Sequence, residues 1–511
     1  MLWMAWPASG FAPLLLIAFV PLFILEEKIL AAKKQGIKIR LFKWNYLCFL
    51  LFNLLTTWWI WYASNWGMMM AVACNALFMA AIFQLFHLTR LRLGNFSGYT
   101  SLIFYWTAFE YMHLNWNLSW PWLNLGNGFA SLTSWIQWYE CSGTLGGTFW
   151  ILSSNILLFD LFRLKQKFNH RKLFAWTLVI FIPIIISKVI AANYSEEEQK
   201  AKSIVVVQPN IDPYNEKFAG MSAADQLNKI LRLASSLTDS ATDYVVCPET
   251  ALPEGIWEHE LAIHPDIEAL RDFIKPFPHL HLVTGLASNR LYREGDRLSA
   301  TARKLRDKNF YYDSYNTGMQ LDNSGRIQLY HKSKLVIGVE ALPFNFLEPI
   351  AINLGGASGS LGIQPEPSVF FSADSTGIAP VICYESVYGE YVSEYVKKGA
   401  NAIFIITNDG WWHDTPGYRQ HCQYARLRAI ETRRSIARSA NTGISCFINQ
   451  LGEISQPTKW WTDDVIKHTI HLNKEQTFYT KHGDYIGRIA SFCSALVLIV
   501  LIGIFVKKRR E

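Results

Sequence analysis

The chain has 511 residues, of which 50% are hydrophobic and only 17% charged, and its formal net charge is +7. The charged residues are concentrated in the middle of the chain, so this composition excludes a single soluble globular domain. It predicts a membrane part joined to a soluble part. The eight cysteines form no C-x-x-C pair and no Cys/His spacing typical of zinc, so we expect no disulfide framework, no metal site and no cofactor.

Long uncharged runs predict seven membrane-spanning helices. The run over 44–86 is long enough for two spans of about 20 residues, with a turn near 64–67. The other runs are 11–25, 97–109, 143–159, 173–186 and 489–506. We therefore expect a transmembrane domain over 1–192 with about six spans, and a C-terminal transmembrane helix over 489–506.

Lysine and arginine cluster on every second connection between these runs, which is the pattern of cytoplasmic loops. The basic connections are 26–43, 87–95, 163–172 and the tail 507–510. By this alternation the soluble part faces the opposite side, which for the inner membrane of a bacterium is the periplasm. The same loops account for the net charge better than a polyanion-binding surface does, so we expect no nucleic-acid partner.

The soluble part, expected over 203–473, alternates short apolar runs with helix-length stretches. Most of the runs are continuous rather than alternating, as in strands that are covered on both faces. The stretch 224–237 carries one apolar helical stripe that includes Leu227, Ile230 and Ala234. These features predict a layered α/β fold with helices outside a pair of sheets. The expected strands are 203–208, 244–247, 281–286, 317–321, 378–383, 402–407 and 444–448.

Three of these segments end on residues that suit nucleophilic catalysis. Cys383 ends one apolar strand, Glu249 follows another, and Lys332 follows a short strand-like run. A lone cysteine is usually an inert buried hydrophobe, but the two other segments favour a role for this one. A thiol with a pKa near roughly 8.5 needs a base to attack an ester, and Glu249 is the candidate.

The tetrahedral intermediate of such an attack carries an oxyanion, which needs fixed positive charge or N–H donors. Lys332 is expected to supply the charge, with the backbone N–H of Tyr384 as a second donor. Glu385 is a candidate for a supporting role, although a solvated carboxylate in a loop is the alternative. His331 points away from the site if Lys332 points into it, so we assign it to packing.

The three segments, in the order Glu, Lys, Cys, resemble the signatures of the carbon–nitrogen hydrolase (nitrilase) superfamily. Such a domain flanked on both sides by membrane helices is more narrowly similar to the apolipoprotein N-acyltransferase family. Further segments carry the same resemblance: 315–317, 407–412, 420–421, 425–431, 441–443 and, in the membrane half, 121–123 with Glu110 and Gly126. The resemblance implies a multi-pass α-helical membrane domain plus a nitrilase-like αββα sandwich. It also implies a supporting role for Glu340, eight residues beyond Lys332.

The resemblance further implies a ping-pong reaction. Cys383 takes an acyl chain from a membrane phospholipid as a thioester. The thioester then acylates the α-amino group of the diacylglyceryl-cysteine that begins an apolipoprotein. The expected partners are therefore the phospholipid donor, the apolipoprotein acceptor and the membrane itself, and a monomer is expected.

The chain departs from the family pattern in three places. The loop over 335–343 differs after Lys332, and Phe218 stands where the family commonly has tryptophan. The loop charges also place the amino terminus outside, which predicts that a first span is missing or truncated. Two alternatives stay open: a membrane-tethered nitrilase-like amidase that hydrolyses a small amide, and a non-catalytic membrane binding protein on the same fold.

Overall fold

The computed structural model describes residues 1–37, 39–163, 169–196, 201–218, 220–305, 310–341 and 360–510. The chain divides into two compact units. One is helical and comprises Met1–Trp61, Asn65–Tyr194 and His482–Glu511; the other is α/β and comprises Tyr62–Ser64 and Ser195–Lys481. Lys38, Lys165 and Lys167 of the expected basic connections, and Leu342 and Pro343 of the altered loop, lie outside the described residues.

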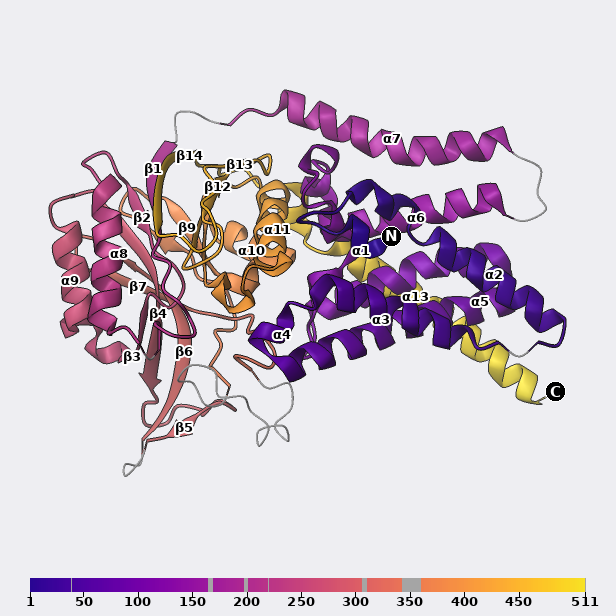
Figure 1. Ribbon diagram of the computed structural model, residues 1–511, viewed down its shortest axis with the longest axis horizontal. Helices are drawn as coiled ribbons and strands as arrows, with labels where there is room; N and C mark the ends of the chain where they lie inside the picture. The colour runs from indigo at the N-terminus through magenta and orange to yellow at the C-terminus, as the bar shows by residue number, and fades with distance from the viewer. Residues whose placement is uncertain are drawn as a thin grey trace. The chain divides into compact units, whose positions relative to one another are not determined.

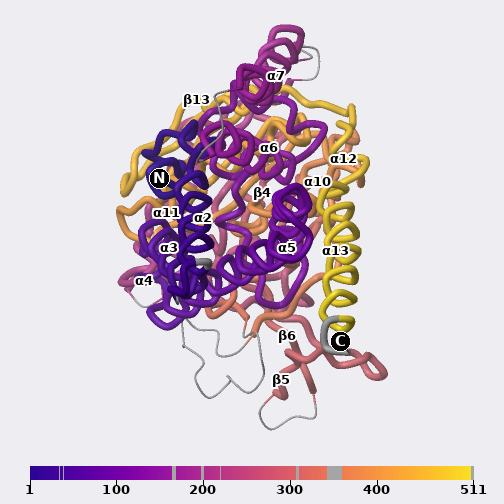
Figure 2. The backbone as a smooth tube through the Cα atoms, turned by 90° about the vertical axis from the view of Figure 1, so that its right-hand side faces the viewer, coloured from indigo at the N-terminus to yellow at the C-terminus, as the bar shows by residue number. Residues whose placement is uncertain are grey.

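The helical unit is built from long apolar helices joined by short 3-10 turns. Its helices are α1 (Leu2–Ala5), α2 (Val20–Lys34), α3 (Leu41–Thr57), α5 (Asn65–Leu114), α6 (Tyr139–Phe162), α7 (His170–Asn193) and α13 (Tyr485–Arg510), and its 3-10 turns are η1 (Ala12–Ile17), η2 (Pro121–Leu123), η3 (Leu125–Phe129) and η4 (Thr133–Trp135). The short helix α4 (Ile60–Ala63) has residues in both units. Although α13 is far from α5 in sequence, it packs along α5 (Figure 2).

Among the described residues, four helices are long and apolar enough to cross a membrane, namely α5, α6, α7 and α13. The helices α2 and α3 are shorter, at 15 and 17 residues. The expected total of seven spans stays a prediction.

The expected connection over 87–95 is much shorter in the structure than in the prediction. The chain is helical through this stretch and is interrupted at Gly94, where φ is +85° and ψ is 179°. Only glycine adopts this region without strain, so a single residue replaces the loop and separates two helical segments of α5.

The α/β unit contains two sheets (Figure 1). The described part of the first sheet has eight strands in the order β14-β1-β2-β4-β6-β5, with β3 paired to β4 and β7 paired to β6. Its strands are β1 (Ala201–Gln208), β2 (Tyr244–Val246), β3 (Leu252–Trp257), β4 (His281–Leu291), β5 (Arg303–Lys304), β6 (Tyr311–Leu321), β7 (Ile327–His331) and β14 (Asp464–His471). At its centre β1, β2 and β4 run parallel.

The second sheet has six described strands in the order β13-β12-β11-β10-β9-β8, with β9, β10 and β11 parallel. Its strands are β8 (Phe370–Phe371), β9 (Gly377–Ile382), β10 (Ala402–Thr407), β11 (Ile436–Ala440), β12 (Cys446–Ile448) and β13 (Ile454–Ser455). All residues of β9, β10 and β11 are buried. Such burial is typical of strands covered on both faces.

Helices cover the outer faces of both sheets, as Figure 1 shows. The helices α8 (Ala223–Leu237) and α9 (Pro265–Ile274) pack on the first sheet, and α10 (Gly389–Lys397) and α11 (Pro416–Thr432) pack on the second, while the short α12 (Phe478–His482) follows β14. Ser222 caps α8 by accepting a hydrogen bond from the Asp225 N–H, and the apolar stripe of Leu227, Ile230 and Ala234 is buried in the core. The fold class is therefore confirmed: a multi-pass α-helical membrane domain plus an αββα sandwich.

Candidate active site

Cys383 lies directly after β9, at the first residue of the 3-10 turn η8 (Cys383–Val387). Its φ of +50° is in the left-handed region, which costs a non-glycine residue about 1–3 kcal/mol. The chain therefore turns sharply off the end of a buried strand. Cys383 itself is 8% exposed. This is the strand exit that the sequence predicts.

Burial raises the pKa of the Cys383 thiol well above its ordinary value. The Glu249 carboxylate raises this pKa further, whereas the Lys332 ammonium lowers it. Both charges therefore lie close enough to the sulfur to influence its ionisation. The resting thiol is protonated near neutral pH and needs a base before it can attack.

Glu249 lies in the turn that follows β2 and is fixed by hydrogen bonds to both of its carboxylate oxygens. Its Oε1 accepts from Asn316 Nδ2 at 2.7 Å and from Lys332 Nζ at 3.0 Å, and its Oε2 accepts from the Asn408 N–H at 3.0 Å. Gly285 on β4 allows this turn to approach, because a Cβ there would lie 2.7 Å from the Cα of Glu249.

Lys332 follows β7 and is almost completely buried, at 1% exposure. Its Nζ donates to Glu249 Oε1 and, at 2.8 Å, to Glu340 Oε1. Burial alone lowers the pKa of Lys332, but Glu249 and Glu340 outweigh it and raise the pKa well above its ordinary value. Lys332 therefore holds a positive charge beside the thiol.

Glu340 and Glu385 are both anchored rather than solvated. Glu340 Oε2 accepts from the Val336 N–H at 2.8 Å, and its Oε1 also accepts from Asn316 Nδ2 at 3.0 Å. Glu385 is completely buried and accepts from the Ile382 N–H at 2.9 Å and the Ser333 N–H at 2.7 Å. Glu385 thus ties the end of β9 to the segment that carries Lys332.

The neighbours of the predicted residues face elsewhere. His331 Nε2 lies 2.7 Å from Glu258 Oε1, and its ring stacks on Tyr315 with centroids 4.0 Å apart. His331 therefore packs away from Lys332, as expected from the alternation of side chains along a strand. Tyr384 is buried beside Tyr388. Burial raises the pKa of Cys247 to about 12, which is typical of an inert core thiol.

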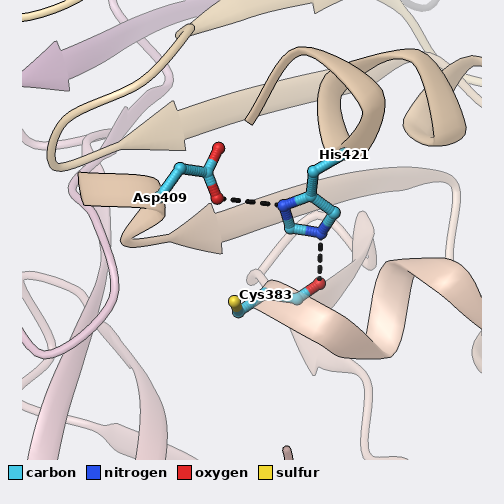
Figure 3. Close-up of side chains that lie close together, drawn as sticks. All are labelled: Cys383, Asp409 and His421. Atoms are coloured by element: carbon cyan, nitrogen blue, oxygen red, sulfur yellow. Dashed lines mark hydrogen bonds and ion pairs between the residues drawn. The ribbon is translucent and has the colours of Figure 1, made fainter. Parts of the chain in front are cut away.

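Sequence reasoning assigned no role to three buried groups beside the site, namely Asp409, His421 and Arg438. His421 Nδ1 lies 2.9 Å from Asp409 Oδ1, and Arg438 Nη2 donates to Asp409 Oδ2 at 2.6 Å. His421 Nε2 lies 3.2 Å from the backbone oxygen of Cys383, and Figure 3 shows the imidazole facing this carbonyl rather than the sulfur. Asp409 and His421 lie in the segments 407–412 and 420–421, which carry part of the family resemblance, so the sequence did mark these two residues.

Cys383, Asp409 and His421 also place possible metal-ligand atoms within 4.8 Å of one another. These residues do not fit a metal ion. Asp409 Oδ1 accepts from Thr407 Oγ1 at 2.8 Å, and its Oδ2 is paired with the Arg438 guanidinium. The guanidinium neutralises Asp409 and opposes a second cation, and burial keeps the thiol protonated.

Lys217 is a further buried cation that the sequence did not single out. Its Nζ donates to the backbone oxygen of Glu249 at 3.0 Å. Burial lowers the pKa of Lys217 to about 8, although Glu249 acts in the opposite direction. The adjacent Phe218 stacks on Trp411 with ring centroids 6.1 Å apart, so an aromatic contact is retained at the position where the family commonly has tryptophan.

Two family models match the chain. The carbon–nitrogen hydrolase model matches residues 204–479, and the model of the apolipoprotein N-acyltransferase N-terminal domain matches residues 1–157. A solved crystal structure of an amidase from Nesterenkonia sp. aligns with a TM-score of 0.38 at 14% identity, covering 58% of this chain and 98% of that one.

Curated relatives match along nearly the whole chain. The apolipoprotein N-acyltransferase of Chlorobaculum tepidum is 30% identical over 517 residues, covering 99% of this chain and 94% of the relative. The enzyme of that name from Geobacter metallireducens is 25% identical and covers 94% of this chain and 89% of the relative. Because both halves of the chain match together and in order, this protein belongs to the apolipoprotein N-acyltransferase family.

Proposed function

We propose that this protein transfers an acyl chain from a membrane phospholipid, through a thioester on Cys383, to the α-amino group of the diacylglyceryl-cysteine of an apolipoprotein. The observation that carries the proposal is the position of Cys383, a buried thiol at a sharp strand exit that is influenced by the Glu249–Lys332 ion pair. Membership of the family supports the choice of donor and acceptor.

In the first step Glu249 accepts the thiol proton while the sulfur attacks the ester carbonyl of the phospholipid. Lys332 and the backbone N–H of Tyr384 stabilise the oxyanion of the tetrahedral intermediate. When the intermediate collapses, the C–O bond breaks. Glu249 returns the proton to the departing oxygen, so that lysophospholipid leaves and the acyl chain stays on Cys383 as a thioester.

In the second step the α-amino group of the acceptor attacks the thioester. Glu249 accepts a proton from the amine, the C–S bond breaks, and the proton returns to the sulfur, which restores the resting thiol. Exclusion of water from the buried site protects the thioester from hydrolysis between the two steps. The four long apolar helices support a site supplied with lipid directly from the bilayer.

The loop charges support an orientation in the bacterial inner membrane with the α/β unit in the periplasm. The phospholipid donor and the diacylglyceryl group of the acceptor then both lie in the leaflet that faces the periplasm. Glu340 and Glu385 act by holding Lys332 and the strand exit in place, as their hydrogen bonds to both segments suggest.

The proposal is tested by incubating the purified protein with phospholipid that carries a labelled acyl chain. We expect a labelled protein band that hydroxylamine removes, and transfer of its label to a synthetic diacylated lipopeptide. The band should be absent in Cys383→Ala and present in the matched control Cys74→Ala, which alters an exposed cysteine of the helical unit. Absence of an acyl-enzyme would contradict the proposal, and release of all the label into water would favour the amidase alternative.

A further inference from the structure

We infer that His421 is a positioning residue that fixes the peptide bond between Cys383 and Tyr384, and thereby aims the Tyr384 N–H at the oxyanion. The inference rests on the proposed thioester chemistry at Cys383. In it His421 neither accepts the thiol proton nor contacts the sulfur. Figure 3 presents the arrangement from which it follows.

The contacts of His421 are made to the backbone of the nucleophile. Its Nε2 lies 3.2 Å from the carbonyl oxygen of Cys383 and 3.0 Å from Ser386 Oγ. Ser386 Oγ itself donates to the same carbonyl oxygen at 2.8 Å. Two side chains from two elements, α11 and η8, therefore hold one carbonyl group.

A fixed carbonyl fixes the amide on the other side of the same peptide bond. The peptide unit is planar and trans, so the Tyr384 N–H points opposite to the Cys383 C=O. Rotation of this unit as a whole would turn the N–H away from the site and bring a carbonyl oxygen toward the developing oxyanion. Cys383 already has a strained φ of +50°, so its turn needs outside contacts to persist.

The imidazole is itself immobilised. Asp409 Oδ1 lies 2.9 Å from Nδ1, and Arg438 and Thr407 hold Asp409 in turn. His421 is 1% exposed, and Asp409 and Arg438 are completely buried. Asp409 Oδ1 accepts from Nδ1–H, so Nε2 is the nitrogen presented to Cys383. The ring faces an acceptor at each nitrogen, and Nε2 donates to the carbonyl oxygen in the doubly protonated form of the ring, in which both nitrogens are donors.

This role makes a prediction that a base or a purely structural residue does not make. Both acylation of Cys383 and transfer of the acyl chain pass through an oxyanion, whereas alkylation of the sulfur by iodoacetamide does not. Loss of the His421 donor should therefore slow both acyl steps by about 10- to 100-fold and leave alkylation of Cys383 unchanged.

The experiment compares His421→Leu, which cannot donate, with His421→Gln, whose amide can reach the carbonyl. Single-turnover acylation and transfer are measured with labelled phospholipid, and alkylation of the Cys383 peptide is followed by mass spectrometry. We expect both acyl rates to fall in His421→Leu and to recover in large part in His421→Gln. His279→Leu, the same change at an exposed loop histidine, should behave as wild type.

Equal acyl rates in wild type and His421→Leu would overturn the inference, and so would a parallel loss of alkylation, which indicates activation of the thiol. If His421→Leu does not fold, Ser386→Ala decides, because it removes the other donor to the same carbonyl and should produce the same split between acyl transfer and alkylation. Failure of wild type itself to form an acyl-enzyme would refute the proposed function instead.

Discussion

At the scale of single residues, Glu249 acts on the thiol in two opposing ways. Its charge raises the pKa of Cys383, in addition to the larger effect of burial, and so disfavours the thiolate at rest. In the proposed reaction the same carboxylate accepts the proton as the sulfur attacks. The Glu249 carboxylate therefore disfavours the thiolate before substrate binds, and it accepts the thiol proton only when the sulfur attacks a bound substrate.

These two effects can be separated with Glu249→Gln. Removing the charge lowers the pKa of Cys383 while Lys332 stays paired with Glu340. At a given pH the variant therefore has more thiolate, and we expect faster alkylation of Cys383 by iodoacetamide than in wild type. Acylation by phospholipid should instead slow by about 10²- to 10⁴-fold, because the base is missing.

The measurement follows both reactions between pH 7 and pH 9. In wild type, alkylation should climb with pH through this range without a plateau, because the raised pKa of the thiol lies above it. The control is Glu254→Gln, at an exposed position on β3, which should change neither rate. Slower alkylation in Glu249→Gln would contradict the electrostatic account.

Cys383, Glu249 and Lys332 could be singled out as candidates from the sequence, because each of them stands at the end of an apolar strand-like run. The residue type and its place after a strand are both visible in a short stretch of sequence. The contacts of Asn316 and His421 could not be predicted in this way. Asn316 donates to two carboxylates that are 67 and 24 residues away in the chain. His421 contacts a backbone oxygen, and a pattern of side chains in the sequence does not predict contacts to the backbone.

At the scale of secondary structure, continuous apolar strands were the most predictable feature. The expected runs over 402–407 and 378–383 correspond to β10 and β9. The strand β11 was missed because its sequence includes Arg438 and Ser439, although all of its residues are buried. Arg438 Nη2 donates to Asp409 and Ser439 Oγ donates to the Val207 carbonyl oxygen, and these partners outside the strand are set by the tertiary fold.

One pair of membrane helices is joined by a hydrogen bond that compensates for a proline. Pro183 lies inside α7 and has no N–H, so the carbonyl of Val179, four residues earlier, lacks its helical donor. Trp150 Nε1, on α6, donates to this carbonyl oxygen at 2.7 Å. The bond therefore both satisfies the freed carbonyl and fastens α6 to α7.

We predict that Trp150→Phe lowers the free energy of unfolding by about 0.6 to 1.7 kcal/mol, which are the average and the largest values for side-chain hydrogen bonds between membrane helices. In a Pro183→Ala background the same change should cost much less, because the new N–H can donate to Val179. Denaturant unfolding in detergent micelles measures both costs.

The matched control is Trp176→Phe. Its indole Nε1 donates at 3.1 Å to Ser154 Oγ, which also joins α7 to α6 but involves no carbonyl freed by a proline. The cost of Trp176→Phe should therefore be the same with proline or alanine at 183. An equal cost of Trp150→Phe in both backgrounds would show that the indole does not replace the missing N–H.

At the scale of the whole molecule, the division into a helical unit and an α/β unit follows from the uneven distribution of charge along the chain. The proposed donor and acceptor must both meet the α/β unit on one side of the membrane. Which side this is depends on the orientation of the chain, and the charges of its loops predict that orientation. The basic residues on alternate connections predict that this side is the periplasm.

Two introduced cysteines test this orientation. Glu294→Cys places a thiol at an exposed position between β4 and β5, and Gln35→Cys places one at an exposed position in the expected cytoplasmic connection after α2. In cells with a permeable outer membrane, a membrane-impermeant maleimide should label the first and not the second.

After lysis both introduced cysteines should react, because both side chains are exposed. The unaltered chain gives the background labelling, because Cys48, Cys74 and Cys141 of the helical unit are exposed in it as well. Labelling of residue 35 alone in intact cells would reverse the orientation and remove the α/β unit from the compartment in which we propose that it works.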